Sequence, residues 1–137
     1  MQRLRAIHAV QQLTTWVNRP DWHTILPAYA RCVRITRDQP GRFSVNPSAF
    51  VEAPEGELFT ALLAAESRLA AQRAKDSASV DDCLNAFLPM IPAINHFFDI
   101  VLVMAEDLSL RQNRLGLLQR IAALAEGIAD LSKLEGF

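Results

Sequence analysis

The segment from about residue 108 to residue 134 constrains the fold most, because its apolar residues follow two sides of a helix. One series consists of Leu110, Leu117, Ile121, Leu124, Ile128 and Leu131, and the other consists of Leu115, Leu118, Ala122, Ala125 and Ala129. A helix that is solvated on one face needs only one apolar stripe. A helix with two stripes must lie between neighbours, so this segment predicts a long central C-terminal helix in a bundle.

The rest of the chain has apolar residues at helical intervals of three and four in five further segments. These segments cover about residues 2–17, 21–37, 54–75 and 80–88, followed by one centred on Ile94, Phe97 and Phe98. The spacing lapses only around residues 38–54. We therefore predict an all-α fold in which residues 1–137 form a single domain, a bundle of about six helices with one structured loop.

Polar residues mark the expected helix starts. Asp21 and Asp107 stand where they can cap the helices that follow, and Ser79 with Asp82 forms a capping box. Pro27 lies inside the second predicted helix and should kink it or delay its regular start. Apolar side chains are expected to hold the loop against the bundle: Phe43, Val45, Phe50 and Val51.

The composition excludes several classes of protein. Half of the residues are apolar, which suits a packed domain and not a disordered tail. No apolar run reaches the roughly 20 residues that a membrane span needs, and the most apolar run, residues 100–105, is expected to be buried. Cys32 and Cys83 are single and far apart, which predicts two free thiols in a reducing compartment, the cytoplasm. We expect no membrane partner.

The sequence contains no recognisable catalytic or metal-binding constellation. Its three histidines are scattered, its glycines are all isolated, and no Gly-x-Ser-x-Gly motif is present. The acidic pairs Asp81-Asp82 and Glu106-Asp107 precede or open predicted helices, where capping explains them without catalysis. His96 and Asp99 are too few for a metal site. The chain is therefore predicted to bind or to support, and not to catalyse.

Charge is distributed unevenly along the chain. Residues 1–51 contain seven arginines and two aspartates, whereas acidic residues outnumber basic ones thirteen to seven in residues 52–137. Nucleic acid requires a local positive surface and not a basic total, so the first third of the chain is compatible with an RNA partner in spite of the net charge of −1.

Four arginines carry the main binding signal: Arg31, Arg34, Arg37 and Arg42, here called the arginine ridge. The first three lie one helical turn apart on the second predicted helix. Guanidinium groups in such a row can follow the phosphates of an RNA strand. The aromatic residues Trp22, Tyr29 and Phe43 could stack on unpaired bases or belong to the core. The competing interpretation is a solvated face with ion pairs to acidic residues such as Asp38.

A second candidate set lies in the last predicted helix. Arg111 and Arg114 stand one turn apart with Asn113 between them. These side chains can donate hydrogen bonds to RNA. Ion pairing with Glu106 is the alternative for the basic pair, and Arg114 can equally bond carbonyl groups within the bundle.

One segment resembles a known family. Residues 94–107 read INHFFDIVLVMAED and residues 110–118 read LRQNRLGLL, which is similar to the closing motif of glycyl-tRNA synthetase β subunits. Upstream, YARCVRI at residues 29–35, VNPSAF at 45–50 and PEGEL at 54–58 are similar to further parts of that family. The resemblance extends from about residue 4 to residue 134. A weaker similarity connects the chain with the DALR-type anticodon-binding domain of arginyl-tRNA synthetases.

The resemblance implies an enzyme of α and β subunits that attaches glycine to its tRNA with ATP and magnesium. The α subunit would carry the chemistry, and this chain would be the last, anticodon-binding domain of β, without a cofactor of its own. Its expected partners are glycine tRNA and the rest of the synthetase, and not DNA. The chain would be either a fragment of a longer β subunit or a natural short paralogue.

The family role implies contacts with an anticodon that contains two adjacent cytosines. Reading a cytosine requires an acceptor for its exocyclic amine and donors for its ring acceptors. A carboxylate or carbonyl can accept, and arginine or asparagine can donate. The alternatives are a helical protein-interaction domain that docks on the rest of the synthetase without contacting RNA, and the anticodon domain of an arginyl enzyme.

Overall fold

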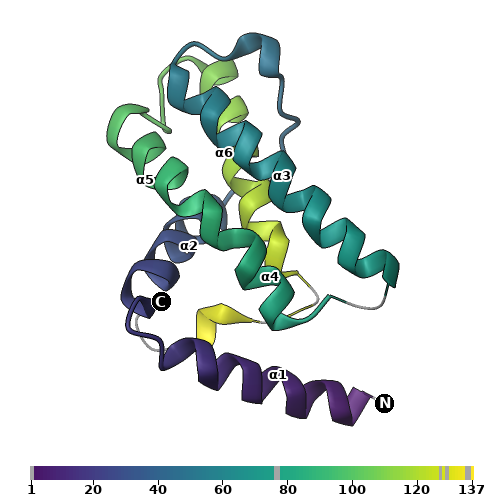
Figure 1. The fold of residues 1–137 in the computed structure, drawn as a ribbon. Helices are drawn as coiled ribbons and strands as arrows, with labels where there is room; N and C mark the ends of the chain where they lie inside the picture. The colour runs from purple at the N-terminus through teal and green to yellow at the C-terminus, as the bar shows by residue number, and fades with distance from the viewer. Residues whose placement is uncertain (1, 76–77, 127, 129, 135–136) are drawn as a thin grey trace.

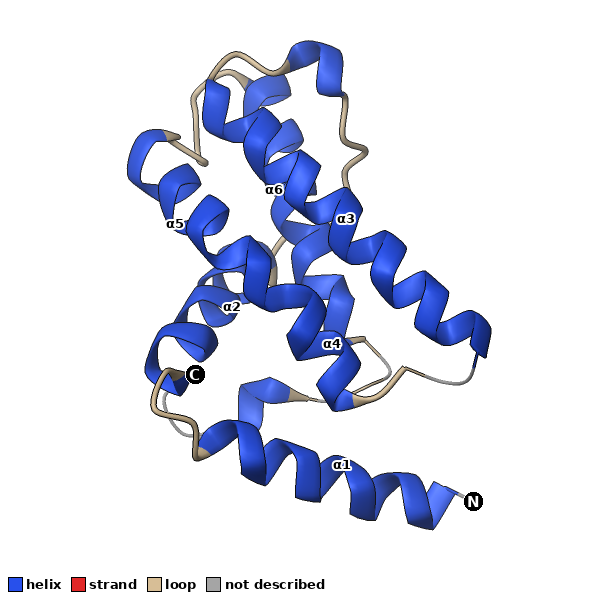
Figure 2. Cartoon of the chain, viewed as in Figure 1, coloured by secondary structure: helices blue, strands red, loops and turns tan. Residues whose placement is uncertain are grey.

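The computed structural model describes residues 2–75, 78–126, 128, 130–134 and 137, and the side chains among them from residue 9 onward. Within these ranges the regular structure is helical and contains no strand (Figure 2). The α-helices are α1 (Gln2–Val17), α2 (Trp22–Thr36), α3 (Ala53–Lys75), α4 (Val80–Phe87), α5 (Ile91–Ile100) and α6 (Leu108–Ala122). Short 3-10 helices are η1 (Pro47–Ala49), η2 (Leu88–Met90), η3 (Ala123–Ala125) and η4 (Leu131–Lys133). The predicted all-α bundle is confirmed.

Helix α6 lies at the centre of the bundle, as its two apolar stripes predict. It packs against α2 on one side and α3 on the other, while α3 also contacts α4 and α5 (Figure 1). Leu115, Leu117, Leu118 and Ile121 are almost completely buried. Helix α1 lies at one end, where it contacts α4 through a hydrogen bond from Trp16 Nε1 to Asp81 Oδ1 of 2.7 Å.

The last helix is shorter than predicted. It ends at Ala122 and continues as η3, and Glu126 has extended backbone angles. In a continuing helix the carbonyl of Ala122 would accept a bond from the backbone N–H of Glu126. Instead, the hydroxyl of Tyr29 donates to that carbonyl at 2.7 Å, and the N–H of Glu126 bonds Ala123. The prediction of one helix from 108 to 134 is therefore wrong, and α3 is longer than α6.

The predicted helix starts are largely confirmed. Ser79 and Asp82 form the capping box of α4, and Asp107 accepts hydrogen bonds from two backbone N–H groups at the start of α6. Asp21 occupies the N-cap position of α2 but makes no capping bond with its side chain. Its carboxylate pairs with Arg19 instead, at 2.9 Å. Helix α2 begins directly after Asp21 and runs through Pro27, so the predicted delay is wrong.

The apolar run 100–105 is only half buried. Val101, Val103 and Ala105 point into the bundle, whereas Leu102 and Met104 are 67% and 50% exposed. Val101 has extended backbone angles directly after α5, and residues 103–104 form a turn, so the run leaves the helix and only part of it packs on the core. Val51 is also exposed, which corrects its predicted role in holding the loop, while Phe43, Val45 and Phe50 do pack on the core.

The burial of the phenylalanine pair and of the two cysteines agrees with the predictions from the sequence. Phe97 is fully buried, and its neighbour Phe98 is partly buried against the same cluster. Cys32 and Cys83 are both buried free thiols, and burial raises the pKa of each. Among the described residues no helix is both long and apolar enough to cross a membrane.

Candidate nucleic-acid interface

The ridge arginines Arg31 and Arg34 of α2 and Arg37, directly after it, are all exposed. The guanidinium of Arg31 lies over the ring of Phe98, 4.0 Å from its centroid. Arg34 donates through Nη1 to the backbone carbonyl of Phe137. Within the described parts of the chain, none of the three, Arg37 included, forms a salt bridge with an aspartate or glutamate side chain. The ion pair with Asp38 that the competing interpretation required is therefore not formed there.

Arg42 follows α2 in the loop and is the one ridge arginine with an acidic partner among the described residues. Its Nη2 contacts Oε1 of Glu126, and the two side chains remain 69% and 60% exposed. Loop residues beside Arg42 are held by Gln119 of α6. Oε1 of Gln119 accepts from the backbone N–H of Phe43 at 2.9 Å, and its Nε2 donates to the carbonyl of Gly41 at 2.8 Å. The bundle thus fixes the segment that carries Arg42.

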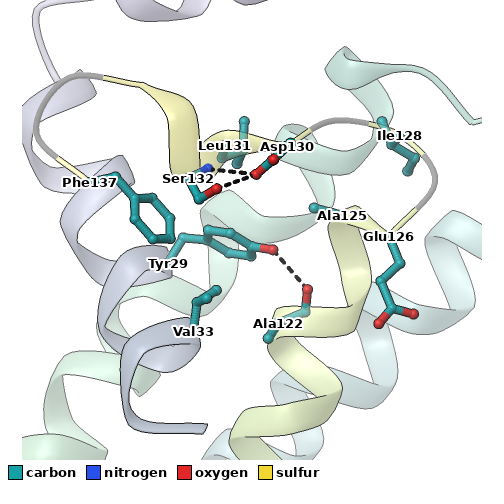
Figure 3. A pocket seen from close by; sticks show the side chains of 10 residues that line it. All are labelled: Tyr29, Val33, Ala122, Ala125, Glu126, Ile128, Asp130, Leu131, Ser132 and Phe137. Atoms are coloured by element: carbon teal, nitrogen blue, oxygen red, sulfur yellow. Dashed lines mark hydrogen bonds between the residues drawn. The ribbon is translucent and has the colours of Figure 1, made fainter. Parts of the chain in front are cut away.

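A groove runs beside the ridge, between α2 and the chain that follows α6. One part has a volume of about 440 Å³ and is lined by Tyr29, Val33, Thr36, Arg37, Gln39, Gly41, Arg42, Gln119, Ala122, Ala123 and Glu126. The adjoining part has a volume of about 410 Å³ and extends to Phe137 (Figure 3). Tyr29, Val33, Ala122 and Glu126 line both parts. The part that extends to Phe137 is mainly apolar, whereas the part next to the ridge is lined by both apolar and polar side chains.

Tyr29 belongs to the core as well as to the groove wall. It is 8% exposed, its ring meets Phe87 edge-on at 5.6 Å, and its hydroxyl is bonded to Ala122. Burial raises the pKa of this hydroxyl. Trp22 is equally buried. Of the two alternatives for these aromatics, the core role holds for both, and Tyr29 also lines the groove.

Asn113 and Arg114 do not join this surface. Both are buried, at 5% and 4% exposure. Oδ1 of Asn113 accepts from the backbone N–H of Asn46 at 2.7 Å, and its Nδ2 donates to the carbonyl of Asn46 at 3.0 Å. This amide therefore ties the loop to α6. The hypothesis that Asn113 contacts RNA is corrected, because its hydrogen-bonding groups are used inside the domain.

Arg114 has the structural role that the sequence left open. Its Nε donates to Glu55 at 3.0 Å, its Nη1 donates to the carbonyl of Leu102 at 2.7 Å, and Glu52 lies 3.5 Å from Nη2. Burial works to raise the pKa of Glu55, but backbone N–H groups of Glu52 and Val51, together with Arg114, lower it. Arg114 is thus withdrawn from RNA.

Arg111 is partly buried and donates to the carbonyl of Ala105 at 3.3 Å. It makes no salt bridge with Glu106 among the described residues. Its carbonyl bond supports the start of α6, apart from the groove.

His96 pairs with Glu57 at 2.9 Å, and no cluster of metal-ligating side chains occurs in the described ranges.

A second surface feature lies at the α5–α6 connection. Four large apolar side chains are at least half exposed there: Ile100, Leu102, Met104 and Leu108, here called the apolar surface. Exposed acidic residues accompany it, namely Asp99, Glu106 and Asp107. The connection lies at the end of the bundle where α3 begins, away from the C-terminus beside α2 (Figure 1). The sequence predicted this run as core and so missed the surface.

The sequence also did not indicate Glu126 as a candidate site residue, because it fell within the predicted last helix. Its position depends on the end of α6, which a contact with Tyr29 across the bundle determines. Local spacing carries no signal of that contact.

Comparison with known proteins gives a consistent assignment. The model of the DALR anticodon binding domain matches residues 25–131. The chain is 39% identical to the glycine–tRNA ligase beta subunit of Anaeromyxobacter sp. (strain K) over 120 residues, which cover 85% of this chain and 17% of that protein. It is 37% identical to the same subunit of Myxococcus xanthus over 92% of this chain and 18% of the relative. For Citrifermentans bemidjiense the identity is 36% over 96% of this chain and 19% of the relative.

The chain thus spans less than a fifth of the length of these curated relatives. The matched region of the family model contains most of α2 and all of α3 to α6, including the whole arginine ridge.

Proposed function

Since the chain belongs to the DALR anticodon-binding domain family, we propose that it binds the anticodon limb of glycine tRNA through the arginine ridge. The observation that carries the proposal is the exposure of Arg31 and Arg34 on α2 and of Arg37 directly after it, none of which pairs with an aspartate or glutamate side chain among the described residues. Guanidinium groups in this arrangement can follow successive phosphates.

The groove beside the ridge supports recognition of a splayed-out strand. RNA bases that leave the stack are held by contacts of their faces with protein side chains and by hydrogen bonds to their edges. Val33, Ala122 and Tyr29 provide apolar lining, while Arg37 and Arg42 line the part next to the ridge. The groove can therefore receive a base while the ridge holds the neighbouring phosphates.

By analogy with the relatives, the domain supports glycyl-tRNA formation and does not catalyse it. On this proposal ATP and magnesium act elsewhere in the synthetase, and the protein partners are the rest of β and the α subunit. The place of action is the cytoplasm, in keeping with two reduced, buried cysteines.

The test is a binding titration of the chain with glycine tRNA and with a tRNA of another specificity, each at several salt concentrations. We expect tighter binding of the glycine tRNA and a fall of affinity with salt that reflects several phosphate contacts. No binding at low salt, or equal binding of both tRNAs, would contradict anticodon recognition.

The apolar surface favours a second candidate function, docking on another protein. Contiguous exposed apolar side chains are uncommon on isolated domains and mark interaction sites. Its acidic neighbours Asp99, Glu106 and Asp107 suit a partner with apolar side chains and a basic rim, and they oppose RNA. The two functions use different surfaces, so one domain can serve both.

This second candidate is tested with a double variant, Leu102→Ser and Met104→Ser. The chain is mixed with the α subunit and with a Myxococcus xanthus β subunit lacking the matched segment, and complex formation is followed by gel filtration. We expect a complex that the double variant does not form. The control is Leu63→Ser, which removes an exposed apolar side chain from α3. Absence of the complex with the control as well would contradict a specific role of the apolar surface.

A further inference from the structure

We propose that Glu126 and Arg42 together read a cytosine base of the bound RNA, with Glu126 as the residue that distinguishes cytosine from uracil. The inference rests on the proposed function, because it assigns a base-reading role within the same groove.

Glu126 stands where the two parts of the groove meet. Figure 3 shows its side chain at the rim, across the groove from Phe137 and Val33, with the carboxylate directed away from the Tyr29 ring. Arg42 reaches the same point from the loop after α2. An acceptor from one segment and a donor from another thus meet at the edge of the groove, where the edge of a base would lie.

Among the polar side chains of this region, those of Tyr29, Gln119 and Asp130 are already used within the domain. Both ends of the Gln119 amide are bonded to the loop, and the Tyr29 hydroxyl is bonded to Ala122. Asp130 accepts from the backbone and hydroxyl of Ser132. By contrast, the side chains of Arg42 and Glu126 bond only each other among the described residues, through one nitrogen and one oxygen. Their remaining donors and acceptor are free for a ligand within that part of the chain.

A carboxylate at this place is not explained by phosphate binding or by stability. Beside the arginine ridge it repels phosphates, and an ion pair as exposed as this one contributes little to folding. A role in base recognition accounts for it, because a carboxylate accepts a hydrogen bond from an exocyclic amine.

The hydrogen-bonding pattern of the pair fits cytosine and opposes uracil. Cytosine presents its N4 amine as a donor, followed by the acceptors N3 and O2. Glu126 can accept from N4, and the guanidinium of Arg42 can donate to N3 and O2. Uracil presents the acceptor O4 in place of the amine, so the carboxylate would face an oxygen. The two adjacent cytosines of a glycine anticodon provide such a base.

The test compares two variants with the same change of charge, Glu126→Gln and the control Glu106→Gln at the α5–α6 connection. Glu106 is exposed and lies outside the groove. Each protein is titrated with glycine tRNA and with two altered tRNAs, in which one or the other anticodon cytosine is replaced by uracil. A glutamine amide can accept from N4 or donate to O4, so it cannot separate the two bases.

We expect the unaltered chain to prefer cytosine at one of the two positions. The preference should fall roughly 5- to 150-fold in Glu126→Gln and stay unchanged in Glu106→Gln. If Glu126→Gln keeps the preference, or strengthens binding of all three tRNAs equally, the pair is a surface ion pair or a mask over Arg42, and the inference is overturned. It is also overturned if the unaltered chain binds glycine tRNA without any cytosine preference, in which case tRNA binding by the ridge still stands. Failure to bind any tRNA would instead contradict the proposed function itself.

Discussion

Arg114 of α6 donates from Nε to Oε1 of Glu55 in α3 across 3.0 Å, and neither residue is more than 4% exposed. The same arginine bonds the carbonyl of Leu102, while the other oxygen of Glu55 accepts from the backbone N–H groups of Val51 and Glu52. One buried ion pair thus joins the start of α3, the loop before it and the α5–α6 connection. It also fixes the backbone on which the exposed side chain of Leu102 is presented.

The first prediction concerns the removal of one partner of this pair. Arg114→Leu should destabilise the domain by about 3–5 kcal/mol, because it leaves the carboxylate of Glu55 buried without its counter-charge. Urea unfolding followed by circular dichroism measures the change. The matched control is Arg111→Leu, which removes a partly buried arginine with one carbonyl bond and should cost clearly less. Equal costs would mean that the buried pair adds nothing specific.

The second prediction is the pH dependence of the same pair. The pKa of Glu55 is lowered in the folded chain. A lowered folded pKa gives stability that is complete above the unfolded value, roughly 4.3, and is lost as pH falls through the folded value. The difference in unfolding free energy between the unaltered chain and Glu55→Gln should therefore be constant from pH 7 to about pH 5 and shrink at lower pH. A difference that grows on acidification would contradict the ionised state of Glu55.

The sequence predicted the helical class and most helix boundaries because those depend on local chemistry. Apolar spacing defines the faces of α3 and α6, and side-chain caps at Ser79 and Asp107 begin α4 and α6. These signals lie within a few residues of the structure that they specify, so a single chain is enough to read them.

The end of α6 and the division of the arginines depend on contacts between distant segments. Tyr29 takes the carbonyl of Ala122 although 93 positions separate them, and Arg114 meets Glu55 across 59 positions. On a helix Arg114 looks as available as Arg34, and only the assembled bundle decides which of them faces solvent.

The third prediction tests the contact between α6 and the loop that carries Arg42. A Cβ atom on Gly116 would lie 2.8 Å from the carbonyl oxygen of Phe43 and 3.3 Å from Val45 Cγ2. Gly116→Ala should therefore cost about 1–3 kcal/mol and displace the loop. Gly56→Ala in α3 is the control, since nothing lies within 4 Å of the added atom. There the better helix former should raise stability by up to about 1 kcal/mol. Thermal unfolding decides, and a neutral Gly116→Ala would mean that the loop does not pack as described.

The fourth prediction separates a capping aspartate from one that merely precedes a helix. Asp107 accepts from the N–H groups of Ser109 and Leu110 at 2.9 and 3.2 Å, whereas Asp21 makes no capping bond. Asp107→Ala should lower the melting temperature by roughly 2–8 °C, and Asp21→Ala by less, because only the first leaves backbone donors unsatisfied. If both variants melt alike, the side-chain cap is not what stabilises the start of α6.

The fifth prediction concerns the ridge arginines one at a time. Replacing Arg34 or Arg37 by Ala should weaken binding of glycine tRNA and of a non-cognate tRNA by similar factors, because phosphates are common to both. The slope of log affinity against log salt should fall by somewhat less than one for each phosphate that is no longer bound. Arg31→Ala should have a smaller effect if its stacking on Phe98 holds it away from the strand. An effect confined to the cognate tRNA would indicate base reading instead.

The decisive form of this prediction replaces the three ridge arginines on and directly after α2 by Ala at once. The matched control carries the same change of charge on α3, through Ala at Arg68, Arg73 and Lys75, which are exposed and line no part of the groove. Net charge alone weakens any polyanion complex through the field of the whole protein, so both variants should bind tRNA less tightly. Only in the α2 variant should the salt slope fall by about two to somewhat less than three, since counterion release reports the phosphates that are bound and not total charge. Full affinity and an unchanged slope in the α2 variant would show that the ridge does not touch RNA. An equal fall of slope in both would place the phosphates along α3 as well.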